Sequence, residues 1–102
     1  LLRRAANFAG TQAPNGDLIL AYEDIFWGNA GNGVVKYLRQ GKDGWTRVIV
    51  DDEGPAGEYI DVATDSKGKP LIAYYSQPIR GLRVYDETEG ATDQVAAPQD
   101  SP

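Results

Sequence analysis

Two stretches of this chain return in the same order about fifty residues later. Gly16-Asp17-Leu18-Ile19-Leu20-Ala21-Tyr22 returns 52 positions later as Gly68-Lys69-Pro70-Leu71-Ile72-Ala73-Tyr74. Gly33-Val34-Val35-Lys36-Tyr37 returns 48 positions later as Gly81-Leu82-Arg83-Val84-Tyr85. Glycine, tyrosine and the apolar positions recur together, and the first copy has the longer loop between its two stretches. A period of this length predicts an array of similar folding units.

Turn residues divide each unit into short strands, and no segment has helical periodicity. Asn15-Gly16 and Asp65-Ser66-Lys67-Gly68 suit tight turns, because glycine accepts a positive φ and Asn or Asp bonds nearby backbone amides. Each unit is expected to run strand, turn, strand, loop, strand, turn, strand. We expect one unit over residues 5–52, a second and incomplete unit over 58–97 with 94–97 as a weak fourth strand, and a tail over 98–102.

The second strand of each unit is apolar on both of its faces. Residues 18–22 and 71–75 lack the alternation of a half-buried strand, and a short apolar run between turns indicates burial on both sides. Two units alone would leave one face of each bare, whereas closed propellers contain roughly four to eight blades. The sequence therefore predicts an all-β fold of antiparallel four-stranded blade-like repeats, about two blades of a β-propeller. The alternative is a β-sandwich that folds the two copies face to face.

The second unit carries a distinctive turn and strand. Asp65, Gly68, Pro70, Tyr74 and Tyr75 form an Asp-x-x-Gly-x-Pro turn followed by an apolar-Ala-Tyr-Tyr strand. Together with Trp45 at the start of an outer strand, this pattern resembles the repeats of bacterial exported β-propeller proteins over residues 34–85. The first copy departs from it, since Pro14-Asn15-Gly16-Asp17 replaces the turn and Glu23 replaces the second tyrosine. The resemblance implies a propeller fold and an extracellular or periplasmic location, but no single activity.

Most of the repeated residues are assigned to packing and turns. Recurrence at equivalent positions indicates a repeated structural role, in which each buried tyrosine hydroxyl finds a local partner. The structural repeat residues are Gly16, Tyr22, Gly33, Tyr37, Trp45, Asp65, Gly68, Pro70, Tyr74, Gly81 and Tyr85.

Composition excludes several classes of function. The chain has 15 acidic and 10 basic residues, and its net charge of −5 disfavours a nucleic-acid partner. It has no Cys, His or Met, and therefore no thiolate or imidazole for nucleophilic catalysis or for a transition-metal site. No apolar run is long enough to cross a membrane. We expect no catalytic residue, no metal and no cofactor.

The long loop over residues 23–33 is the candidate ligand site. Trp27 could stack on the face of a sugar while Asp24 and Asn29 bond its hydroxyls, because long loops on a rigid scaffold often carry function. The competing interpretation is that the aromatic residues of this loop cap the core. The acidic stretch 51–53 is interpreted as a solvated turn, with a calcium site as the alternative.

These observations favour a non-catalytic function. We expect a structural or protein-interaction propeller module of an exported bacterial protein, whose ring is completed by other protein chains or further copies. One alternative is a carbohydrate-binding propeller that uses Asp24, Trp27 and Asn29, with a glycan as its partner. A second alternative is a fragment of a glycoside hydrolase whose catalytic carboxylates lie in other blades.

Overall fold

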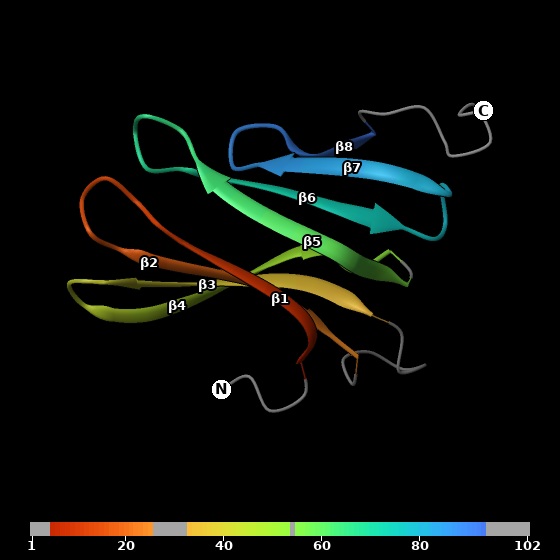
Figure 1. The fold of residues 1–102 in the computed structure, drawn as a ribbon, viewed down its shortest axis with the longest axis horizontal. Coiled ribbons are helices and arrows are strands. Elements are labelled where there is room, and N and C mark those ends of the chain that lie inside the picture. The colour runs from red at the N-terminus through yellow and green to blue at the C-terminus, as the bar shows by residue number, and fades with distance from the viewer. Residues whose placement is uncertain (1–4, 26–32, 54, 94–102) are drawn as a thin grey trace.

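The chain forms two antiparallel β-sheets in the computed structural model, which describes residues 5–25, 33–53 and 55–93 (Figure 1). The all-β prediction is confirmed. In each sheet the four strands lie side by side in chain order. The first sheet contains β1 (Ala5–Gln12), β2 (Leu18–Asp24), β3 (Val34–Gly41) and β4 (Gly44–Asp51). The second contains β5 (Ala56–Thr64), β6 (Pro70–Ser76), β7 (Gly81–Asp86) and β8 (Gly90–Asp93).

Equivalent turns open the two sheets. In the first, Ala13 N–H bonds Asp17 O at 2.8 Å and Gly16 N–H bonds Ala13 O at 2.9 Å. In the second, the matching bonds are Asp65 N–H to Lys69 O and Gly68 N–H to Asp65 O. Gly16 and Gly68 both have a positive φ, which only glycine adopts at low cost. The two turns therefore share one backbone structure despite their different sequences.

The fourth strand of the second sheet lies earlier in the chain than the sequence predicts. β8 begins at Gly90, whereas the predicted strand over residues 94–97 lies outside the described residues. Asp86 explains the early reversal, because its Oδ1 accepts the N–H groups of Thr88 and Glu89 at 2.9 and 2.7 Å. Gly90 then completes the turn with a φ of 79°.

The third strands of the two sheets are equivalent at an offset of 47 rather than 48 residues. Tyr22 pairs with Lys36 between β2 and β3, and Tyr74 pairs with Arg83 between β6 and β7, so Lys36 corresponds to Arg83. A slip of one residue moves every side chain of a strand to the other face. Tyr37 and Tyr85, which match in sequence, therefore lie on opposite faces of their units.

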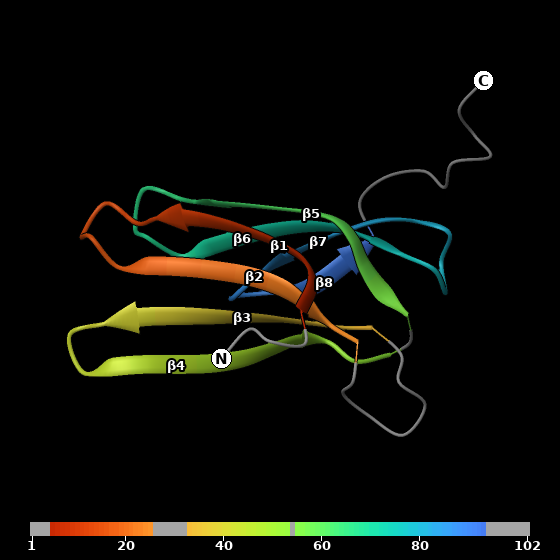
Figure 2. The same cartoon turned by 60° about the horizontal axis from the view of Figure 1, so that its bottom comes forward.

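The core lies between the two sheets. β5 packs against β1 and β2, and these neighbouring first strands β1 and β5 run in the same direction (Figures 1 and 2). We call the side of each sheet that points to the other sheet its inner face, and the opposite side its outer face. The buried apolar cluster comprises Ala13, Ile19, Ala21, Val35, Tyr37, Ala56, Val62, Ile72 and Tyr74.

Gly57 is needed where β5 approaches the end of β2. Its φ is 116°, and a Cβ on it would lie 2.7 Å from Glu23 Cβ. We expect Gly57→Ala to lower the free energy of unfolding by about 3 kcal/mol, because backbone strain and overpacking add. Gly44→Ala is the control, since Gly44 has a φ of 109° but open space around its Cα. Urea unfolding at one chain concentration tests this, and equal losses in the two variants would contradict a close sheet contact at Gly57.

Candidate functional site at the junction of the two sheets

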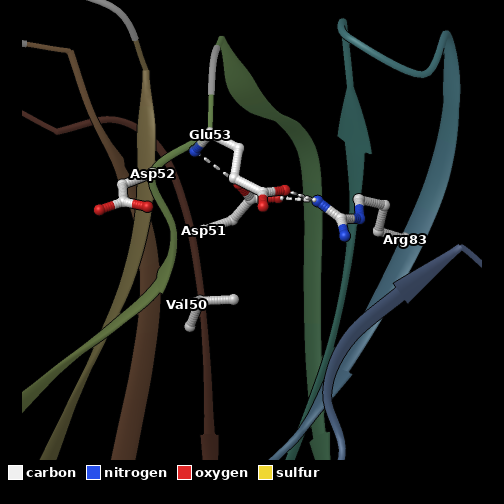
Figure 3. A pocket seen from close by; sticks show the side chains of 5 residues that line it. All are labelled: Val50, Asp51, Asp52, Glu53 and Arg83. Atoms are coloured by element: carbon white, nitrogen blue, oxygen red, sulfur yellow. Dashed lines mark hydrogen bonds and ion pairs between the residues drawn. The ribbon is translucent and has the colours of Figure 1, made fainter.

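The end of β4 and the following connection meet β7 in a shallow hollow of about 160 Å³. Figure 3 shows the side chain of Arg83 reaching from β7 toward two carboxylates of this connection. Asp52 points away from it. The hollow is lined by Val50, Asp51, Asp52, Glu53 and Arg83.

Asp51 is the centre of this junction. Its side chain is 2 % exposed, and its Oδ2 accepts hydrogen bonds from Tyr74 Oη at 2.6 Å and from Arg83 Nη1 at 2.9 Å. Its Oδ1 accepts the N–H of Glu53 at 3.0 Å. Arg83 Nη1 also bonds Glu53 Oε1 at 2.8 Å. A carboxylate on the first sheet is thus held by two donors from the second sheet.

The chemistry of this junction is that of an anchor. Both oxygens of Asp51 already accept hydrogen bonds, which compensates the cost of burying its charge. Burial and then the hydrogen bond to Asp51 raise the pKa of Tyr74, so its hydroxyl stays a donor at alkaline pH values where an exposed tyrosine ionises. Among the described side chains, no group of three or more carboxylates is arranged to hold a metal ion. The arrangement joins the two sheets.

Two further polar contacts cross between the sheets. Arg39 on β3 bonds Gly68 O of the second sheet through Nη1 at 2.9 Å, while its Nε bonds Asp17 at 2.8 Å. Tyr37 donates its hydroxyl to Glu87, and its ring lies 6.1 Å from that of Tyr85. Burial and the Glu87 carboxylate raise the pKa of Tyr37. The junction is therefore tied along β3 as well as at Asp51.

The predicted ligand site is only partly described. Trp27 and Asn29 lie outside the described residues. Asp24 ends β2, and its Oδ2 forms an ion pair with Lys36 Nζ at 3.0 Å. The side chain of Lys36 is almost fully buried, so this pair compensates a buried cation. The carboxylate of Asp24 thus forms an ion pair within its own sheet.

The repeated residues occupy turns, strand starts and the two faces of the sheets. Gly33 precedes β3, while Pro70 and Gly81 begin β6 and β7. Asp65 accepts the N–H groups of Lys67 and Lys69 in the turn before β6, and these bonds lower its pKa. Trp45, which the sequence assigns to packing, is 40 % exposed near the start of β4.

Both outer faces expose large apolar side chains. Strand register places Phe8, Leu18 and Ile49 on the outer face of the first sheet together with Trp45. It places Leu71 and Leu82 on the outer face of the second sheet. Apolar side chains gathered on one face of a sheet are typical of a surface that another protein element covers.

The two sheets bury opposite faces of the repeated unit. β2 and β6 are equivalent at 52 residues, and β2 turns Ile19 and Ala21 inward. The equivalents of these residues, Leu71 and Ala73, belong to the outer face of the second sheet. Instead, Ile72 and Tyr74 of β6 point inward. The units therefore stack head to tail. The face that the first unit buries corresponds to the outer face of the second unit, and the face that the second unit buries corresponds to the outer face of the first.

Sequence reasoning missed the Asp51 junction. It treated residues 51–53 as a solvated turn, although only Asp52 and Glu53 are exposed. The available signal was the presence of Lys36 and Arg83 within apolar strands, since a charge in such a strand needs a partner. Comparison with protein-family models, curated proteins and solved structures gives no match to this chain. Among the described residues, no helix is long and apolar enough to span a membrane.

Proposed function

We propose that this chain is a non-catalytic structural and protein-interaction module, in which each sheet is one blade of a β-propeller. The observation that carries the proposal is the head-to-tail stacking of the two sheets, with opposite faces of the repeated unit meeting at the junction. A stack of this kind leaves one face of each type on the outside, where Phe8, Leu18 and Ile49 are exposed on the first sheet and Leu71 and Leu82 on the second. Successive blades of a propeller pack in this way, since every blade offers one face to each neighbour.

The exposed apolar residues favour a blade over a β-sandwich. A self-contained sandwich buries the apolar side of each sheet and turns polar side chains outward. Here Leu18 is 41 % exposed and Leu71 is 37 % exposed, and both lie on outer faces. These strands are apolar on both sides, as strands between two neighbouring blades must be.

A structural role is also supported by the use of the charged groups. Asp51, Arg83 and Asp24 all take part in ion pairs that join strands or sheets. Export to the periplasm or the extracellular space is part of this proposal and derives from the motif of residues 65–75. Carbohydrate binding stays a prediction, because two of its three residues lie outside the described residues.

The proposal is tested by whether the chain needs a partner. We expect the purified chain to associate rather than remain a monomer, because exposed apolar side chains on both outer faces would otherwise remain in water. Light scattering should give a mass above that of one chain, and the thermal unfolding midpoint should rise with chain concentration. A folded monomer with a cooperative, concentration-independent transition would contradict the proposal.

A further inference from the structure

We propose that the two outer faces of this chain bind each other between copies. In this arrangement the outer face of the first sheet of one copy packs on the outer face of the second sheet of another. This inference rests on the proposed function and names the partner of its open faces, which is a second copy of the chain. The junction inside each copy provides the template for the contact between copies.

The outer face of the second sheet corresponds, residue by residue, to the inner face of the first sheet, which is buried inside the molecule. Ile19, Ala21, Val35 and Tyr37 form the inner face of the first sheet and are almost fully buried by the second sheet. Strand register assigns them the equivalents Leu71, Ala73, Leu82 and Val84. All four equivalents are apolar and lie on the outer face of the second sheet, where Leu71 and Leu82 are exposed. This face therefore has the composition of one that accepts a following sheet.

The outer face of the first sheet corresponds to the inner face of the second sheet, which packs on the first sheet inside the molecule. Pro70, Ile72, Tyr74 and Arg83 lie on the inner face of the second sheet, where the first three are buried and Arg83 bonds Asp51 of the first sheet. Their register equivalents are Leu18, Leu20, Tyr22 and Lys36. The same order of an apolar pair, a tyrosine and a cation is thus present on the outer face of the first sheet. Tyr22 and Lys36 are themselves buried within the chain, so a second copy would contact this face through its exposed side chains, which are Phe8, Leu18, Trp45 and Ile49.

The two faces are also complementary in shape. The outer face of the second sheet has a hollow of about 180 Å³ whose lining includes Ala63, Leu71, Ala73 and Val84. Val84 stands where the first sheet has the larger Tyr37, so this face has more room than its template. The outer face of the first sheet presents Phe8, which is 65 % exposed on β1 beside Tyr22. A protruding aromatic side chain on one face thus faces a hollow on the other.

Among the described residues, the charged side chains that have no ion-pair partner within their own sheet have opposite signs on the two outer faces. Arg47 is exposed on the outer face of the first sheet, whereas Lys36 on the same face is buried and already paired with Asp24. The described strand positions on the outer face of the second sheet include Asp61 and Asp86 and no lysine or arginine. Charge complementarity of this kind favours a contact between unlike faces over a contact between like faces.

A contact between unlike faces repeats until it closes. Head-to-tail interfaces generate rings when the rotation between subunits closes, and open filaments when it does not. If each sheet is a blade, a closed ring of roughly four to eight blades contains about two to four copies of this chain. The pairing predicts that a substitution that disrupts either outer face stops the assembly of copies. It also predicts that a chain with one face disrupted binds a chain with the other face disrupted.

A mixing experiment tests this pairing. Phe8→Glu places a carboxylate on the outer face of the first sheet, and Leu71→Glu does so on the outer face of the second. We expect each variant alone to have the mass of one chain in light scattering. An equimolar mixture should form a dimer of twice that mass and nothing larger, because one intact face of each type remains. Ser66→Glu, in the exposed turn between β5 and β6, is the control, and it should assemble as the unmodified chain does.

The outcomes separate this inference from the proposed function. A variant that dimerises alone would show a contact between like faces and overturn the pairing, as would a mixture that stays monomeric while the unmodified chain assembles. An unmodified chain that is unfolded, or whose aggregation neither Phe8→Glu nor Leu71→Glu reduces, would support the need for a covering partner but overturn the second copy as that partner. A stable unmodified monomer would overturn both proposals. Circular dichroism verifies folding, and Ile49→Glu and Leu82→Glu repeat the test at other points of the two faces.

Discussion

Arg83→Met is expected to lower the free energy of unfolding by about 3 kcal/mol, because it leaves the buried carboxylate of Asp51 without its cation. Methionine retains much of the side-chain volume of arginine but none of its charge. Tyr74 and the backbone N–H of Glu53 still donate to Asp51, and these bonds compensate only part of the loss. Urea unfolding at a fixed chain concentration measures the difference.

Two companion variants separate the buried pair from its surface neighbour. Glu53→Gln removes the other carboxylate bonded to Arg83, but Glu53 is 71 % exposed, and such a pair contributes less than about 1 kcal/mol. Asp51→Leu combined with Arg83→Met removes both buried charges, so its loss should be smaller than the sum of the two single losses by at least about 1 kcal/mol. Strict additivity would mean that the two groups do not stabilise the junction as a pair.

The repeat in the sequence was sufficient to predict strands, turns and their number in the first sheet. Gly16 and Gly68 mark equivalent turns because few other residues adopt their backbone conformation. Apolar residues on both sides of β2 and β6 indicated that each sheet has two packed faces. These features are local, since a turn or an apolar run depends on residues that are close in the chain.

The junction depends on register, which the sequence pattern misplaced by one residue. If Tyr37 is aligned with Tyr85, then Lys36 is aligned with Val84. The hydrogen-bonded pairing of the strands instead makes Lys36 equivalent to Arg83. Only with the correct register do both cations lie beside a repeated tyrosine. The partner of Arg83 is Asp51 on the other sheet, 32 residues away. No local pattern specifies a contact that forms only after two sheets stack.

The tyrosines at the junction link the stability of the stack to alkaline pH. Burial raises the pKa of both Tyr37 and Tyr74 in the folded chain, and neighbouring carboxylates raise it further. In the unfolded chain both hydroxyls titrate near pH 10. The folded state therefore retains protons that the unfolded state loses, so stability is fully present below about pH 10 and falls as the pH rises beyond it.

The expected loss is large because the two tyrosines act together. Each contributes a slope of about 1.4 kcal/mol per pH unit once the unfolded tyrosine is ionised, which gives about 2.7 kcal/mol per unit for the pair. Free energies of unfolding measured in urea between pH 9 and pH 11 test this range. Tyr74→Phe should reduce the slope by about 1.4 kcal/mol per pH unit, although it also lowers stability at pH 7; burial raises the pKa of Tyr22 and Tyr85 too, and these two keep their share of the slope. Tyr59→Phe is the control, since Tyr59 is 78 % exposed and should leave the slope unchanged. A slope that Tyr74→Phe does not change would mean that this hydroxyl ionises as readily in the folded chain as in the unfolded one, and that the bond to Asp51 does not hold its proton.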